Sequence, residues 1–351
     1  MKAWRGAGGK ARPAASDPSR PPDEATLADL RRRGIELDPG HAQPHDAADD
    51  HEQPDEHQHR DAGVRPLTGI VGAGAVGTAL GGALSRAGWP VAAVASRDAG
   101  RRDRFRTFVP GARAYAEANA LLDDVELVIL AVPDDVIPGL AGELHLYSGQ
   151  AMVHTSGALG AEVLEPAMAA GTQVGAFHPL VAFADTERAI AAFNGAMVAI
   201  EGDDQLAELL AEMAEAIGAT AVRLTPGSKA AYHAAAVLSA GGFVALLDAI
   251  AELGRVAGLD EAGSLAIYGG LIEQTLGNAR ALGISRALTG PVTRGDVGTL
   301  RRHLAAMAEH APDALALYAA AAEREIALAA DRGSITPEVA AAMRDVLAGR
   351  K

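Results

Sequence analysis

The sequence predicts an α/β fold with a mostly parallel sheet, followed by an all-helical region, on the strength of three observations. Between residues 66 and 225, short apolar runs of strand character alternate with helical patterns. Strands that alternate with helices are typical of βαβ units, in which the strands pair in parallel. After Thr225 the strand-like runs stop and only helical patterns follow. We therefore expect two domains, 66–225 and 226–351, with a boundary near Pro226.

Seven apolar runs are expected to form the strands of the sheet. In chain order they read LTGIV, PVAAVAS, VELVILAV, QAMVHTS, TQVGAFHP, AMVAIEG and ATAVRLT. The second domain opens with a long helix, expected from about Pro226 to Val256, that is apolar around most of its circumference. Such a helix is either deeply buried or the core of a dimer. We expect a homodimer that forms through this helical domain.

Composition excludes several classes of function. The chain has 351 residues and no cysteine, which rules out disulfides, thiolate nucleophiles and cysteine-ligated metals. Its formal charge of -14 argues against nucleic acid as a partner, because phosphate binding requires clustered Lys and Arg. We expect no membrane-spanning segment, because no apolar run reaches the roughly 20 residues that span a bilayer, and we see no apolar signal segment at the N-terminus. We therefore expect a cytoplasmic protein with no membrane partner.

Residues 1–65 differ from the rest of the chain in composition. They are rich in Pro, Asp, Arg and His and poor in large apolar residues. We expect a solvated, disordered tail. A tract rich in His and Asp can also bind transition metals weakly, and this one holds His41, His45, His51, His57 and His59. No other spacing of His, Asp or Glu indicates a metal site.

A glycine-rich loop, GAGAVG, follows the first expected strand and precedes a helical pattern. With a strand before it and a helix after it, the G-x-G-x-x-G pattern indicates a dinucleotide site; the alternative is a glycine-rich turn with no ligand. Gly72 would allow the tight turn, Gly74 the approach of the pyrophosphate, and Gly77 close packing of helix and strand. The predicted cofactor loop comprises Gly72, Ala73, Gly74, Ala75, Val76 and Gly77.

The end of the second strand indicates which dinucleotide binds. NAD sites usually carry Asp or Glu here for the ribose hydroxyls, whereas this chain reads Ala95-Ser96-Arg97. A hydroxyl on Ser96 and a guanidinium on Arg97 suit a 2′-phosphate. We therefore expect NADP as the cofactor. The alternative is that Arg97 is a solvated loop residue.

Further contacts to the cofactor and substrate are expected at the carboxyl ends of later strands, where ligands of open α/β sheets bind. After LVIL come Ala131, Val132 and Pro133, which we expect beside the nicotinamide ribose. After the next strand, Ser156 and Gly157 lie at the same edge. We assign Ser156 to the cofactor and Gly157 to the substrate.

The segment PGSKAAYHAAAVLSAGG places two ionisable groups, Lys229 and His233, in a stretch that is otherwise small and mostly apolar. Four residues apart on a helix, they share one face and can point into one cleft. A cation near a helix N-terminus is disfavoured, so we expect an anion of the substrate or cofactor to compensate Lys229. The alternative is a solvated lysine and a core histidine.

A second candidate for binding an acid is Arg294 in TGPVTRGD. Its guanidinium could hold a carboxylate with two hydrogen bonds. The alternative is that Arg294 and Asp296 tie their own loop together. Asp296 could also cap the helix that follows.

Three segments together with the glycine loop resemble a known family. They are GAFHPL (175–180), GSKAAYHAAAVLSAGG (227–242) and LTGPVTRGDVGTLRRHL (288–304). The chain is similar over residues 66–345 to Rossmann-like proteins described as NADP-dependent oxidoreductases, whose C-terminal domain has no assigned function. This family resembles the wider 6-phosphogluconate-dehydrogenase-like superfamily, which includes ketopantoate reductase, β-hydroxyacid dehydrogenase, pyrroline-5-carboxylate reductase and prephenate dehydrogenase.

The resemblance implies a Rossmann-type domain, an NADP cofactor and candidate roles for individual residues. Lys229 matches the position of a catalytic lysine in the β-hydroxyacid and ketopantoate enzymes, where an asparagine stands four residues later. His233 takes the place of that asparagine, which is a departure. His178, followed by Pro179, resembles a motif of prephenate dehydrogenases. We assign Lys229 and His233 to catalysis, and His178, Gly157 and Arg294 to substrate binding.

The expected reaction is hydride transfer between nicotinamide and a small 2-oxo or 2-hydroxy acid, with ketopantoate as the leading substrate by analogy. Two alternatives stay open: an oxidation like that of prephenate dehydrogenase, and a non-catalytic NADP-binding sensor, which the altered lysine–asparagine pair would permit.

Overall fold

The fold is that of a computed structural model, in which residues 65–168, 172–225 and 227–349 are described. The prediction of a disordered tail at 1–65 lies, apart from Arg65, outside the described residues. The chain divides into two compact units, Met1–Ala236 and Val237–Lys351, and each is described by itself. The predicted boundary near Pro226 is ten residues earlier. The first helical turns after Pro226 group with the sheet because their side chains contact the ends of two strands. Lys229, only 6% exposed, lies 3.3 Å from Glu201 of β7, and the His233 ring meets His178 of β6.

The first unit is built on one eight-stranded sheet, with the strand order β3-β2-β1-β4-β5-β6-β7-β8. Every neighbouring pair is parallel except β6 and β7, which are antiparallel. The mostly parallel sheet of the sequence prediction is confirmed. The strands are β1 (Thr68–Val71), β2 (Val91–Ala95), β3 (Arg113–Tyr115), β4 (Leu127–Leu130), β5 (Ala151–His154), β6 (Gln173–Pro179), β7 (Met197–Glu201) and β8 (Thr220–Arg223).

Strand β3 was not among the seven predicted strands. It has three residues, RAY, none of them buried, and it lies at the edge of the sheet. A strand this short and polar shows no run of alternating or continuous apolar residues. Its pairing with β2 is therefore supplied by the tertiary structure rather than by local pattern.

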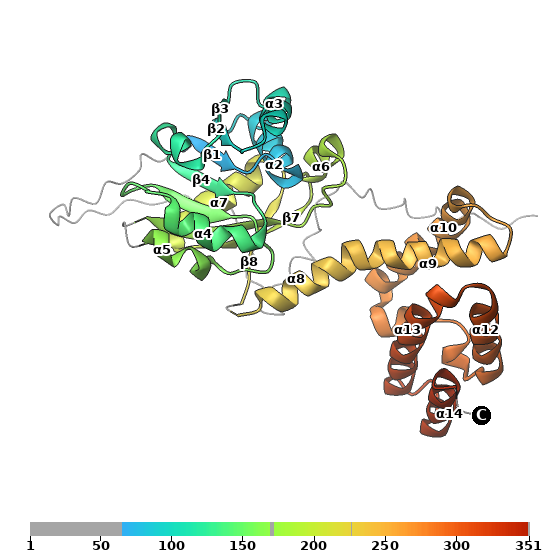
Figure 1. Ribbon diagram of the computed structural model, residues 1–351. Coiled ribbons are helices and arrows are strands. Elements are labelled where there is room, and N and C mark those ends of the chain that lie inside the picture. The colour runs from blue at the N-terminus through green and yellow to red at the C-terminus, as the bar shows by residue number, and fades with distance from the viewer. Residues whose placement is uncertain (1–64, 169–171, 226, 350–351) are drawn as a thin grey trace, which may run out of the picture. The chain divides into compact units, whose positions relative to one another are not determined.

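Helices cover both faces of the sheet, and each face has its own apolar core. Consecutive residues of a strand point to opposite faces, so Ile70 belongs to one core and Val71 to the other. The first face carries α2 (Ala75–Arg86), α3 (Ala99–Phe108), α6 (Thr186–Ala192) and α7 (Asp204–Ala216). The second carries η1 (Ala118–Asp124), α4 (Ile137–Glu143), η3 (Ala161–Leu164) and α5 (Glu165–Met168), as the placement of α4 and α5 in Figure 1 illustrates. The short η2 (Asp134–Val136) precedes α4.

The predicted long helix is present but is not uniform. It comprises α8 (Lys229–Val237), the π-helical segment η4 (Leu238–Gly242) and α9 (Phe243–Val256). The π-helical segment reads LSAGG, and insertions of this kind often occur near functional sites. The helix starts at Lys229, three residues after the predicted start at Pro226.

The second unit is all-helical in the part of the chain described, which confirms the prediction. Besides α9 it contains α10 (Glu261–Leu282), α11 (Ile284–Ala287), η5 (Val292–Arg294), α12 (Val297–His310), α13 (Pro312–Asp331) and α14 (Pro337–Leu347). Its core joins Val292 and Leu300 to Ile326 of α13 and Met343 of α14. Helices α9 and α10 pack closely, since a Cβ on Gly254 would lie 2.0 Å from Oγ of the buried Ser264.

The stretch Lys229–Val256 has a mean hydropathy of 1.9 over its most apolar window, and only 6% of that window is buried. By length and composition it could cross a membrane, so the expectation that no apolar run is long enough to span a bilayer is not met. One such helix is weak evidence for a membrane protein.

Candidate functional site

Each of the three glycines of the GAGAVG loop suits its position for a different structural reason. Gly72 has a φ of +108°, and a Cβ there would lie 2.2 Å from the carbonyl oxygen of Ala131. A Cβ on Gly77 would lie 2.0 Å from the carbonyl oxygen of Gly72, so the helix packs on the loop without a side chain. A Cβ on Gly74 would meet no atom within 4 Å, so a ligand can approach this backbone.

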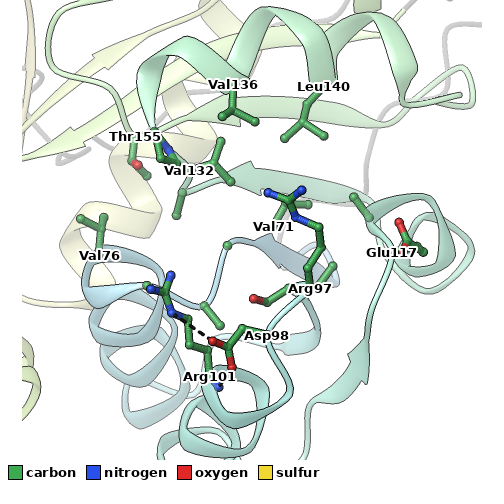
Figure 2. Close-up of a pocket in the computed structure, with 18 of the residues that line it drawn as sticks. Val71, Val76, Arg97, Asp98, Arg101, Glu117, Val132, Val136, Leu140 and Thr155 are labelled. Carbon is green, nitrogen blue, oxygen red and sulfur yellow. Dashed lines mark hydrogen bonds and ion pairs between the residues drawn. The ribbon is translucent and has the colours of Figure 1, made fainter.

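The loop borders a pocket of about 1120 Å³ at the carboxyl ends of β1, β2 and β4. Helix α2 begins here, and its N-cap Gly74 makes no side-chain hydrogen bond to the first turn. The N–H groups of that turn are therefore available to an anion such as a pyrophosphate. Figure 2 shows Val71, Val76 and Val132 around this space. The predicted cofactor residues that line it are Gly72, Ala73, Gly74, Ala75, Val76, Ser96, Arg97, Ala131, Val132 and Pro133.

Two arginines lie at the β2 end of the pocket, Arg97 and Arg101 (Figure 2). Asp98 caps α3 by accepting a hydrogen bond from the backbone N–H of Arg101 at 3.0 Å, and the Arg101 guanidinium lies 3.8 Å from its carboxylate. Among the described residues, no ion pair engages Arg97. The sequence analysis missed Arg101, although its position one helical turn after Arg97 placed it on the same side of the loop.

The loop after β5 places its residues differently from the prediction. Thr155 lines the pocket, whereas Ser156 is not among the lining residues. The Ser156 hydroxyl accepts hydrogen bonds from the backbone N–H groups of Ala158 and Leu159, at 3.2 and 3.0 Å. The hydroxyl oxygen of Ser156, which was predicted to contact the cofactor, is therefore already engaged in stabilising the turn.

The buried His154, at the end of β5, fixes this loop. Its Nδ1 accepts a hydrogen bond from the Ser156 N–H at 3.2 Å, and its Nε2 lies 3.0 Å from the carbonyl oxygen of Gly160. One nitrogen is thus an acceptor and the other a donor, which is the pattern of a neutral imidazole. Burial lowers the pKa of His154 in agreement with that state.

Gly157 lies against a pair of histidines from two different elements. A Cβ on Gly157 would lie 2.2 Å from Nδ1 of His233 and 2.5 Å from Nε2 of His178. The two rings meet edge to face, with centroids 5.5 Å apart. The structure therefore brings together three residues that the sequence analysis had assigned to the site from three separate segments.

Helix α8 presents a polar face to this pair. Lys229, Tyr232 and His233, at positions i, i+3 and i+4, lie on one side of the helix, and the Tyr232 ring packs edge-on against His178 with centroids 5.7 Å apart. Tyr232 was missed, although the i+3 spacing from Lys229 was a readable signal. Buried polar atoms without a hydrogen-bond partner gather here: Nζ of Lys229, the hydroxyl of Tyr232, and Nδ1 of both His178 and His233.

Burial sets the protonation of this face. It lowers the pKa of His178 to about 4, with the charges of His233 and Lys229 adding to the effect. It raises the pKa of Tyr232 to about 12. At neutral pH His178 is therefore uncharged and Tyr232 keeps its proton, so both can donate a hydrogen bond to a ligand.

Lys229 has its counter-ion within the protein. Its Nζ lies 3.3 Å from a carboxylate oxygen of Glu201, the last residue of β7. The sequence analysis expected compensation by an anion, such as a substrate carboxylate or a cofactor phosphate; the anion found beside Lys229 is Glu201, which is remote in sequence. No local pattern in AMVAIEG distinguishes Glu201 from any other acidic residue at the end of a strand.

The cofactor pocket and the polar face are connected by three consecutive residues. Thr155 lines the pocket and Gly157 contacts the histidine pair. Pro133 lines the same pocket, and the next residue, Asp134, is close enough for its charge to affect His178 and Lys229. A ligand in the pocket beside Thr155 and Pro133 would therefore border the polar face.

Arg294 lies in the second unit, exposed, in the η5 segment that precedes α12. Asp296 caps α12 by accepting hydrogen bonds from the N–H and hydroxyl of Thr299, at 2.9 and 2.7 Å. The capping role predicted for Asp296 is confirmed. The role of its neighbour Arg294 in substrate binding stays a prediction. No group of three or more His, Asp or Glu within the described ranges is arranged to hold a metal ion.

Comparisons with known proteins agree with this architecture. Residues 51–179 match the Rossmann-like domain family, and residues 196–325 match a family described as a domain of unknown function, DUF2520. A search of curated proteins finds no match.

Three solved structures illustrate the similarity. The "putative NADP oxidoreductase BF3122" of Bacteroides fragilis is 23% identical, with a TM-score of 0.63 over 74% of this chain and 98% of its own. Protein TM1727 of Thermotoga maritima is 25% identical, with a TM-score of 0.57 over 76% and 99%. A reductive aminase of Aspergillus terreus, solved with NADPH and ethyl-5-oxohexanoate, is 18% identical, with a TM-score of 0.52 over 82% and 95%.

Proposed function

We propose that this chain, which combines a Rossmann-like domain with a DUF2520 domain, is an NADP-dependent oxidoreductase. The reaction is hydride transfer between nicotinamide and a small 2-oxo or 2-hydroxy acid of the ketopantoate type. The observation that carries the proposal is the short loop Thr155–Gly157, which joins a dinucleotide-sized pocket to a buried polar face.

The residues present fit a dinucleotide. The pocket of about 1120 Å³ exceeds the range of roughly 300–1,000 Å³ typical of small-molecule sites. In this strand order a dinucleotide lies across the point between β1 and β4 where the order reverses. Its pyrophosphate would then face Gly74, and its two halves would extend toward Arg97 and toward Pro133. Two of the similar structures have names or titles that include NADP or NADPH.

The 2′-phosphate of NADP would lie by Ser96 and Arg97. The guanidinium of Arg97 extends toward the pocket (Figure 2) and has no ion-pair partner within the described part of the chain. Arg101 is the second cation of this end. Two positive charges beside a ribose favour NADP over NAD, because the additional phosphate is charged.

Bound NADPH would supply the hydride, and the residues of the polar face would provide the proton that the substrate oxygen or nitrogen gains. Reduction of a carbonyl places negative charge on its oxygen, which needs a donor within hydrogen-bond reach. Lys229 and His233 are the proposed catalytic residues. His178, neutral at pH 7, and Gly157 would position the substrate. For Arg294, in the second unit, binding of a carboxylate stays a prediction from the sequence.

Two alternative functions have observations in their favour. The His178-Pro179 pair stands at the end of β6 and takes part in the polar face, which suits an oxidation like that of prephenate dehydrogenase. A non-catalytic NADP-binding sensor is favoured by His233, which replaces the asparagine of the family pattern.

Kinetics with purified protein separates the three functions. NADPH oxidation with a panel of 2-oxo acids supports the reductase, and NADP reduction with prephenate supports the alternative enzyme. Tight NADPH binding with no turnover on any substrate favours the sensor. On an accepted substrate, Lys229→Met should keep NADPH affinity and lower turnover at least about a hundredfold. Full turnover by that variant would remove Lys229 from the mechanism.

We also propose that the second unit pairs with a second copy of the chain. Of the 22 residues of α10, Ser264 alone is buried. Large apolar side chains on α10 are exposed, with Ile267 and Leu271 at 57% and 59%. Gly270 and Gly277, seven residues apart, would each have open space around a Cβ, which permits close approach of another helix. Exposed apolar surface of this extent is typical of an interface.

A further inference from the structure

The lysine of the polar face is unusual in this chain. The chain has 27 arginines and four lysines, and the lysines other than Lys229 stand at positions 2, 10 and 351. Lys229 is therefore the single lysine among the described residues, which otherwise use arginine as their cation. An amine can release its proton in a protein, whereas a guanidinium stays charged. Among the lysines and arginines of the described residues, Lys229 alone can therefore lose its charge.

Glu201 contacts two elements at once. One carboxylate oxygen lies 3.3 Å from Nζ of Lys229 on α8. The other accepts a hydrogen bond of 2.7 Å from the backbone N–H of Ala161, which begins η3. The carboxylate therefore links the lysine to the loop that runs from the cofactor pocket past Gly157. The two oxygens have different partners, so a single carboxylate engages both segments at once.

The charges around the amine come from five elements. Burial lowers the pKa of Lys229, and attraction to Glu201 opposes this most strongly, followed by Glu162 on η3 and Asp134 on η2. The other ionisable groups that face it are His154 and His178 on β5 and β6, whose pKa values are both lowered by burial, and Tyr232 and His233 on its own face of α8. Around Lys229, therefore, Glu201 is the acid in direct contact, and His154 and His178 add no positive charge at neutral pH.

We propose that Glu201 is the positioning residue of this site: it tethers the Lys229 amine to the loop after β5 and supplies the negative charge that keeps the amine protonated. This rests on the proposed function, in which that amine donates the proton to the substrate. An ammonium carries three N–H groups, and among the described residues the acceptor close to Nζ of Lys229 is the Glu201 carboxylate, at 3.3 Å. One N–H group faces Glu201, and another is left for the ligand.

The experiment follows the titration of Lys229 in the full chain carrying isotope-labelled lysine. Four lysine side-chain signals are expected by NMR, and the one missing from the Lys229→Met spectrum is that of Lys229. In Glu201→Gln the amide oxygen can still accept from Ala161, but the charge is gone. An opposite charge at this distance moves a pKa by about 1–3 units. We expect the Lys229 signal to titrate at least about one pH unit lower in Glu201→Gln.

Two controls make the result specific. Glu162→Gln removes an equal charge that attracts Lys229 without contacting it, and should move the titration by less than half as much. Glu201→Asp keeps the charge and should restore most of the parent midpoint. An unchanged midpoint in Glu201→Gln, or an equal shift in Glu162→Gln, would overturn the proposal.

Folding and function are tested separately. If Glu201→Gln does not fold, the double variant Glu201→Gln/Lys229→Met removes both charges. Folding of the double variant supports the charge-compensation role of Glu201, and its failure to fold overturns that role by making Glu201 a structural residue of β7. The titration needs neither cofactor nor substrate. A protein that binds no NADPH would refute the proposed function and leave the measured link between Glu201 and Lys229 intact.

Discussion

Replacement of Arg97 by alanine should weaken NADPH binding and leave NADH binding nearly unchanged. Arg97 lines the cofactor pocket, and no ion pair engages it in the described part of the chain. A hydrogen bond to a charged group contributes about 1.5–3 kcal/mol. Arg97 is exposed, so screening by solvent places its contribution at the lower end, about 1.5 kcal/mol, or roughly tenfold in affinity.

Arg101→Ala is the matched comparison. Arg101 already lies 3.8 Å from the carboxylate of Asp98, so its charge is partly compensated and its loss should weaken NADPH binding less than the loss of Arg97. Calorimetric titration of both nucleotides into the parent and the two variants measures these differences. The preference of the parent protein for NADPH over NADH should also decrease as the salt concentration is raised, because exposed charges are screened. Equal affinity of the parent for NADPH and NADH would refute the reasoning.

Three further predictions concern assembly and stability. Light scattering of the detergent-free protein at micromolar concentration should show a homodimer; a stable monomer would contradict the pairing proposed for the second unit. Burial lowers the pKa of His178 from 6.5 to about 4 in the folded chain. The unfolded chain therefore binds a proton at a higher pH than the folded chain does. The stabilisation that comes from the neutral His178 is complete above pH 6.5 and is lost as the pH falls toward 4. We expect urea unfolding to show that the free energy of unfolding falls by about 1 kcal/mol between pH 7 and pH 5, after allowance for screening. The fall should be smaller in His178→Gln. An identical pH dependence of stability in both proteins would exclude His178 as its cause. Gly254→Ala should destabilise the helical unit by about 1–3 kcal/mol, since the new Cβ would lie 2.0 Å from Oγ of Ser264; Gly142→Ala, with open space around its Cβ, is the control, and equal thermal midpoints would refute the packing argument.

The cofactor half of the site was readable from the sequence because its signals are local. A strand, three glycines at fixed spacing and a helix lie within about 20 residues, and the backbone geometry of Gly72 and Gly77 requires those glycines. The same holds for the ends of β2 and β4, where Arg97 and Pro133 follow buried strands directly. For such segments, position in the chain predicts position at the sheet edge.

The polar face was only partly readable, because it depends on contacts between distant segments. The i, i+4 spacing placed Lys229 and His233 on one face, and the same rule could have added Tyr232. Nothing local identifies Glu201 as the counter-ion of Lys229, since 28 residues and a helix separate them. The role of Ser156 was equally hidden, because its hydroxyl stabilises a turn whose geometry follows only from the folded loop.

The central claim is that a nicotinamide dinucleotide binds in the pocket with its reactive end beside the polar face. A crystal structure of the protein with NADPH measures this directly. The account predicts that the pyrophosphate faces Gly74, that the 2′-phosphate contacts Arg97, and that the nicotinamide ring lies next to Thr155–Gly157, within reach of a substrate held by His178 and Lys229. A nicotinamide ring that lies at the Arg97 end, or away from Gly157, would contradict it.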